Sequence, residues 1–122
     1  MTRLIDEGRD IHTLLELWGA WAASDNSGLD FSNVAAGFRG LLPSTSKTRM
    51  QCNDDEGILI DGCVARLKQH RQKEYELVVL HFVYGVSLRA IAKRRKCSDG
   101  TVRKDMGVAV GFIDGGKQLP VG

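Results

Sequence analysis

The chain has 122 residues, of which 43% are hydrophobic, so it can form one domain with a buried core. It carries 17 Lys and Arg against 15 Asp and Glu, and the resulting net charge of +2 excludes a basic field over the whole surface. Any contact with nucleic acid must therefore come from a local patch. The three cysteines are widely separated, with no His at zinc-finger spacing, which favours reduced thiols without a metal or cofactor. No signal peptide and no apolar run of about 20 residues is present, so we expect no membrane partner.

The first helix is expected to begin near Asp10, because an apolar stripe with helical spacing follows it. Gly19 lies within that stripe and leaves room for another element to approach closely. For Trp18 and Trp21, burial in the core is favoured over a partner surface, since aromatic residues on a helical stripe usually bury area. Residues 24–28 form a turn signal that ends the helix. The stripe consists of Ile11, Leu14, Leu15, Trp18, Trp21 and Ala22.

Three short segments follow this turn. Residues 32–37 can form a short helix capped by Ser32, and residues 37–43 favour an ordered connection. Residues 44–49 suit an exposed loop, for which an idle role is favoured over a contact with phosphate.

Asn53 and Glu56 have the spacing of a capping box and predict the start of a longer helix. Its end is basic, and Arg66, Lys68 and Arg71 could either extend a nucleic-acid surface or complement the helix dipole; both interpretations stay open. The buried stripe of this helix is predicted to be Ile60, Cys63, Val64 and Leu67.

The next helix is expected to start near Lys73 or Glu74 and to support the elements that follow it. Gly85 comes directly after its periodic run, which predicts a C-terminal cap. The residues predicted to face inward are Tyr75, Val78, Val79 and Phe82.

Two short helices joined by a tight turn come next. Ser87 is the predicted N-cap of a helix that stops near Lys96 or Cys97, and Ser98 is the N-cap of a second helix. Asp99 adds negative charge to its first turn, where the helix dipole favours it. This layout is that of a helix-turn-helix, whose second helix lies in the major groove of DNA. The buried stripe of the second helix is predicted to be Val102, Met106, Ala109 or Val110, and Ile113.

No stretch predicts a strand, so the expected fold class is all-α, a compact helical domain over residues 1–122. Residues 74–113 are expected to form the helix-turn-helix with its supporting helix. Residues 114–122 are expected to form a flexible tail.

Positive charge is concentrated in the helix-turn-helix, where Asp99 is the only acidic residue between residues 87 and 104. A phosphate backbone favours such a cluster, because each neutralised phosphate releases counterions. A solvated basic face or a protein-binding module are the alternatives, but charge and motif together favour DNA. The predicted DNA-binding residues are Ser87, Arg89, Lys93, Arg94, Arg95, Lys96, Ser98, Asp99, Gly100, Thr101, Arg103 and Lys104.

Catalytic patterns are not found in the sequence. It has no phosphate-binding loop with a Lys and no Gly-x-Ser-x-Gly, and the run of Asn and acidic residues at 53–56 lacks the spacing of a calcium loop. His12, His70 and His81 are expected on separate helices, without acids or cysteines at ligand spacing. We therefore do not expect an enzyme.

Three segments resemble a known family. Residues 18–22 (WGAWA), 37–43 (GFRGLLP) and 75–104 are similar to the antitermination protein Q family of lambdoid phages, in its branch without a zinc finger. Residues 85–104 also resemble region 4 of bacterial sigma factors.

The resemblance implies binding to double-stranded DNA beside a phage late promoter and action on the paused RNA polymerase holoenzyme, including its sigma factor. The polymerase then passes terminators, and in some members nascent RNA at the exit channel is a further partner. By the same resemblance, Arg89, Lys93, Arg94 and Arg95 contact the DNA backbone, while the residues that contact the DNA site are Ser98, Asp99, Gly100, Thr101, Arg103 and Lys104. Trp18, Trp21 and the Phe38 stretch belong to the body or to a polymerase-facing side.

A phage antitermination factor in the bacterial host cytoplasm is therefore the leading hypothesis. One alternative is a helix-turn-helix repressor or activator, which would act on initiation only. A second alternative is a DNA-binding adaptor without an effect on RNA synthesis.

Overall fold

A computed structural model describes residues 10–43 and 49–117, and within these ranges the chain forms helices and no strand, as the sequence predicts. None of the described helices has the length and apolar character needed to cross a membrane. The elements are α1 (Ile11–Trp21), the π-helical turn η1 (Ala22–Asn26), α2 (Ser32–Gly37), the 3-10 turn η2 (Arg39–Leu41), α3 (Asp54–His70), α4 (Gln72–Val78), the π-helical turn η3 (Val79–Val83), α5 (Leu88–Arg95) and α6 (Asp99–Gly116).

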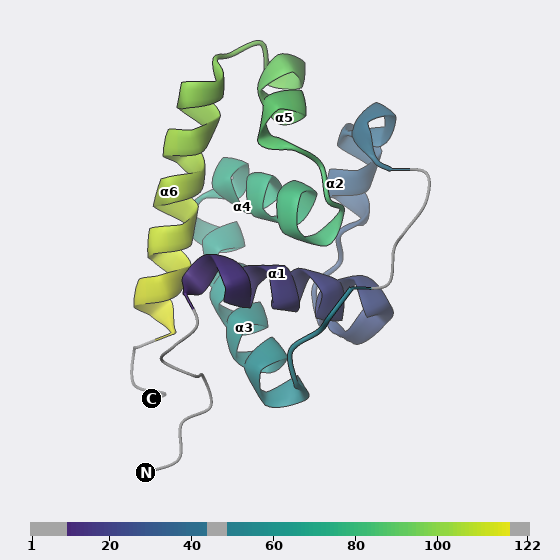
Figure 1. The fold of residues 1–122 in the computed structure, drawn as a ribbon, viewed down its shortest axis with the longest axis vertical. Helices are drawn as coiled ribbons and strands as arrows, with labels where there is room; N and C mark the ends of the chain where they lie inside the picture. The colour runs from purple at the N-terminus through teal and green to yellow at the C-terminus, as the bar shows by residue number, and fades with distance from the viewer. Residues whose placement is uncertain (1–9, 44–48, 118–122) are drawn as a thin grey trace.

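The centre of the fold is the helix formed by α4 and η3, around which α1, α3, α5 and α6 are arranged (Figure 1). A helix that is apolar on all sides must be surrounded by other elements. The four residues predicted to face inward are buried, and Leu77, Leu80 and Val83 are buried as well. The predicted supporting helix is therefore the core of the domain.

The first helix crosses η3 at Gly19, where a Cβ atom would overlap the carbonyl oxygen of Phe82. The predicted close approach at Gly19 is therefore confirmed. A second close approach lies at Gly57 of α3, where a Cβ would overlap the ring of Trp21. Trp18 and Trp21 are 0% and 3% exposed, so they are core residues, and a partner surface at these positions is excluded.

Each indole N–H donates to a carboxylate of α3, which links α1 to that helix. Trp18 Nε1 donates to Asp61 Oδ1 at 3.1 Å, and Trp21 Nε1 donates to Asp54 Oδ1 at 3.0 Å. Because buried indole N–H groups need an acceptor, these bonds fix the orientation of both rings.

The predicted N-caps form where the sequence places them. The side chains of Asn53, Ser87 and Ser98 each accept a hydrogen bond from a backbone N–H three residues later. Asp10, near which the first helix was expected to begin, caps α1 in the same way. Ser32 is an exception: it is the first residue of α2, and its N–H donates to Asp30 Oδ1 at 2.9 Å. The acceptor is thus a carboxylate two residues earlier, and the prediction for Ser32 is wrong.

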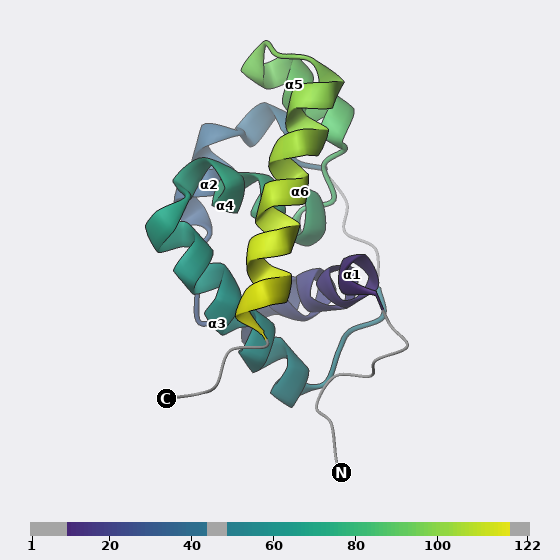
Figure 2. The same cartoon turned by 90° about the vertical axis from the view of Figure 1, so that its left-hand side faces the viewer.

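The last helix, α6, runs along the long axis of the molecule, with its first turns at α5 and its last turns beside α3 (Figure 2). It ends at Gly116 and not at Ile113, so the expected tail is wrong for residues 114–116. Arg66 Nη2 of α3 donates to the Gly116 carbonyl at 3.2 Å, which satisfies a free acceptor at the helix end. Residues 118–122 lie outside the described part of the chain.

The expected loop at residues 44–49 is described only at Arg49. Arg49 Nη1 donates to the Phe82 carbonyl and Nη2 to the Val83 carbonyl, both at 2.9 Å. Arg49 therefore stabilises the end of η3, where acceptors lack partners within the helix, and is neither idle nor directed at phosphate.

Candidate nucleic-acid interface

The connection between α5 and α6 is short and has a defined geometry. Lys96 adopts a left-handed conformation (φ 58°, ψ 45°), which ends α5. Cys97 N then donates to the Ala92 carbonyl at 3.0 Å. The Ser98 hydroxyl accepts from the Thr101 N–H at 3.1 Å and lies 3.0 Å from the Thr101 hydroxyl. These contacts start α6 directly after the turn and confirm the helix-turn-helix.

The N-terminal half of α6 has one buried and one exposed face. The buried stripe agrees with the prediction and includes both Ala109 and Val110. The exposed residues at the start of this helix are Asp99, Gly100, Thr101, Arg103 and Lys104. Polar and basic groups are thus available to a partner, whereas the apolar face holds the helix on the core.

An ion pair links the two helices across the turn. Arg89 Nε of α5 lies 4.0 Å from Asp99 Oδ2, with side chains 87% and 48% exposed. Such an exposed pair contributes little to stability. Its effect is to reduce the negative charge of Asp99 next to the basic residues of α6.

The basic residues of α5 do not share one role. Lys93 is exposed, whereas Arg94 Nη2 donates to the Gly37 carbonyl at 3.0 Å and its guanidinium carbon lies 5.6 Å from the centre of the Phe38 ring. Arg95 Nη2 donates to the Lys73 carbonyl at 3.0 Å and lies 3.6 Å from Glu76 Oε1.

The structure corrects the prediction that Arg95 belongs to the DNA interface. Its side chain is 11% exposed and joins α5 to α4, so it is not positioned to contact a DNA backbone. All other residues predicted to bind DNA are exposed, including Ser87 and Lys96 at the ends of α5. Ser87 also acts as the N-cap of α5 by accepting from the Ala90 N–H at 3.1 Å.

The basic end of α3 is held by contacts within the protein. Besides its bond to Gly116, Arg66 lies 3.4 Å from the sulfur of Cys63, Lys68 Nζ lies 5.5 Å from the centre of the Tyr75 ring, and Arg71 lies 3.6 Å from Glu74 Oε2. These side-chain contacts constitute a role that differs from both interpretations left open by the sequence, a nucleic-acid surface and a complement to the helix dipole.

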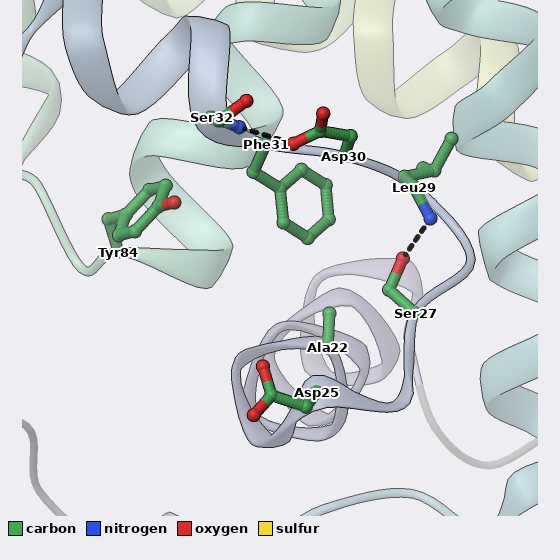
Figure 3. A pocket seen from close by; sticks show the side chains of 8 residues that line it. All are labelled: Ala22, Asp25, Ser27, Leu29, Asp30, Phe31, Ser32 and Tyr84. Carbon is green, nitrogen blue, oxygen red and sulfur yellow. Dashed lines mark hydrogen bonds between the residues drawn. The ribbon is translucent and has the colours of Figure 1, made fainter.

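A polar hollow of about 350 Å³ is lined by residues from positions 22–32 and by Tyr84, and by no residue of the helix-turn-helix (Figure 3). Its carboxylates come from Asp25 and Asp30, and burial together with the negative charge of Asp30 raises the pKa of Tyr84. An acidic lining is unfavourable for phosphate. Within the described ranges, no three His, Cys, Asp or Glu side chains gather to hold a metal ion.

Comparison with known proteins decides the family. Residues 8–119 match the family described as phage antitermination protein Q. The chain belongs to this family. Its members are transcription antiterminators of phages, which agrees with the leading hypothesis from the sequence.

Two relatives and one solved structure illustrate the likeness. The chain is 48% identical to the Probable antitermination protein Q of Acyrthosiphon pisum secondary endosymbiont phage 1 over 108 residues, covering 88% of this chain and 73% of that protein. It is 43% identical to the Prophage antitermination protein Q homolog QuuD of Escherichia coli (strain K12), covering 88% and 84%. The structure of transcription antitermination factor Q21 in complex with Q21-binding-element DNA has the same fold, with a TM-score of 0.64, 24% identity and coverage of 87% and 88%.

Sequence reasoning missed one feature of this antitermination protein Q family member. The segment of Gly37 and Phe38 lies beside α5, through an Arg94 contact that spans 57 residues. A local pattern contains no signal for such a contact. The family resemblance of residues 37–43 marked the segment but left its position open.

Proposed function

We propose that this antitermination factor loads at a phage late promoter by placing the N-terminal half of α6 in the major groove of DNA. The observation that carries the proposal is the exposed basic start of α6, held in place by the Ser98 cap and the buried stripe. The Q21 structure, solved with its binding-element DNA, supports DNA binding by this fold.

In the proposed complex, α6 contacts the bases and α5 contacts the phosphate backbone. In this proposal Thr101, Arg103 and Lys104 on α6 reach base edges, and Arg is the side chain best suited to guanine in the major groove. Arg89 and Lys93 on α5 contact phosphates and set the register. Because net charge is only +2, affinity depends on this local patch.

After loading, the protein engages RNA polymerase holoenzyme with its sigma factor at the promoter-proximal pause and changes how it responds to terminators. Nascent RNA near the exit channel is a further partner in this proposal. The factor acts in the bacterial host cytoplasm as a regulator and has no catalytic activity of its own.

The test is single-round transcription with purified bacterial RNA polymerase holoenzyme on a template carrying the late promoter, its neighbouring site and an intrinsic terminator. The readout is full-length against terminated RNA, with the parent protein, with Arg103→Ala, and with a template lacking the site. We expect read-through that needs both the site and Arg103.

Other outcomes separate the alternatives. Altered initiation with unchanged termination would indicate a repressor or activator. Binding to the template without any effect on RNA synthesis would indicate an adaptor. Read-through that persists without the site would contradict loading at DNA.

A further inference from the structure

The segment that includes η2 is linked to the helix-turn-helix by the side chain of Arg94. Arg94 of α5 donates to the Gly37 carbonyl at 3.0 Å, and its guanidinium carbon lies 5.6 Å from the centre of the Phe38 ring. A Cβ built on Gly40 would lie 3.8 Å from Arg94 Nη1. Arg39, between these residues, is therefore fixed beside the C-terminal half of α5.

The charged side chains of α5 and of the segment around Arg39 are all positive. Arg39 is the only charged residue between residues 32 and 43, and α5 carries basic residues without any acidic one. Arg39 is exposed, and its side chain forms no ion pair with any residue in the described part of the chain. An unpaired guanidinium next to the basic face of α5 fits a phosphate better than an apolar or basic partner.

The position of this segment relative to α6 decides which phosphate it can reach. In Figure 1, α5 lies between α6 and the segment of α2 and η2. In a helix-turn-helix complex the second helix enters the major groove and the first crosses the backbone. The side of α5 opposite to α6 therefore faces backbone that flanks the bases under α6.

We propose that Arg39 is a further DNA contact, which binds a backbone phosphate flanking the site under α6, and that Arg94 is the residue that positions it. The proposal rests on the proposed DNA binding of α5 and α6 and extends that surface to a segment more than 40 residues earlier in the sequence. Arg94 acts by holding the carbonyl at the end of α2, an acceptor without a helical partner.

The test compares Arg39→Gln with the parent on a duplex of about 30 base pairs that carries the site mapped by footprinting on the late-promoter DNA. Loss of one phosphate contact should make the plot of log affinity against log salt shallower by about 0.9. Between 50 and 200 mM salt, the parent should then lose about 3.5-fold more affinity than Arg39→Gln. Arg39→Lys should restore the slope of the parent, because it keeps the charge.

The matched control is Lys117→Gln, which also removes one positive charge but lies at the C-terminal end of α6, away from the helix-turn-helix. Lys117 pairs with Asp114 at 3.3 Å. A helix of 18 residues places it roughly 27 Å from Asp99. This exceeds the screening length of about 10 Å, so the slope should not change.

Shortening the duplex on either flank gives a second readout. If Arg39 binds flanking backbone, the parent and Arg39→Gln should bind equally once the flank that it contacts is removed. Equal slopes for both proteins on the long duplex, with binding still weakened by Arg103→Ala, would overturn the role of Arg39 and leave the proposed function intact. Absence of binding by the parent itself would overturn both.

Discussion

Gly19→Ala is expected to destabilise the fold strongly, although alanine is the better helix former. A Cβ at this position would overlap the Phe82 carbonyl oxygen and lie 3.1 Å from Phe82 Cβ. The oxygen belongs to the backbone of η3 and cannot rotate away as the end of a flexible side chain could. The two helices must therefore move apart at the point where α1 crosses the central helix.

The magnitude follows from two opposing effects. Overfilling a packed core costs typically about 1–3 kcal/mol, occasionally more, and a clash with backbone belongs at or above the upper end. Replacing Gly by Ala inside a helix contributes roughly 1 kcal/mol in the other direction. We expect a net loss of about 2–3 kcal/mol in the free energy of unfolding, which is a large part of the ordinary stability of a domain of about 5–15 kcal/mol.

Urea unfolding followed by circular dichroism measures this loss. With a slope of roughly 1–3 kcal/mol per M, the midpoint should fall by about 1–2 M. Gly62→Ala is the matched control, because Gly62 also lies inside a helix but has no atom near a Cβ. It should gain up to about 1 kcal/mol. If Gly19→Ala gained stability as Gly62→Ala does, the close crossing of α1 and η3 would be wrong.

Three further predictions concern the interface and the core. Arg103→Ala should weaken specific binding by about 1–3 kcal/mol, whereas Lys93→Ala should weaken binding to all sequences alike and lower the salt slope by about 1; parental binding by both variants in a mobility-shift titration would refute the assignment of the helix-turn-helix to DNA. Arg95→Met should keep parental DNA affinity, because the Arg95 side chain is 11% exposed and bonded to α4; a loss as large as that of Arg103→Ala, without unfolding, would return Arg95 to the interface. Burial raises the pKa of Tyr75 to about 12, so the folded state keeps a proton that the unfolded state releases near pH 10. The stability that this difference provides is complete below pH 10 and is lost as the pH rises toward 12, and Tyr75→Phe, which removes a buried hydroxyl without a partner, should abolish this loss in urea titrations at each pH.

The parts of the fold that were predictable are those in which neighbours in the sequence interact. Ser87 and Ser98 each accept a hydrogen bond from an N–H three residues later, so their roles as N-caps depend on local chemistry alone. The buried stripe of α6 follows from helical periodicity for the same reason. Ser32 shows the limit of this reasoning, because α2 begins at Ser32 itself and the Ser32 N–H donates to the Asp30 carboxylate, so Ser32 is not the residue that caps the helix.

The candidate site was predictable in outline but not in its individual members. Residues 93–96 are four consecutive basic residues that look alike in the sequence. Arg95 is largely covered by packing against α4, whereas Arg94 contacts Gly37 and Phe38 at the end of α2, and only the folded structure distinguishes the two. The partners of these two arginines lie 22 and 57 residues away, beyond the reach of any local pattern.

The sequence by itself thus determined that this chain is all-helical, where most of its helices begin, that positive charge gathers on a helix-turn-helix, and which family it resembles. Tertiary structure alone decided which basic side chains are left for a partner, that α4 and η3 form the centre of the fold, and that Arg39 lies beside α5. The physical reason is distance along the chain: caps and periodicity arise from residues three or four apart, whereas burial and long-range hydrogen bonds depend on which surfaces meet after folding.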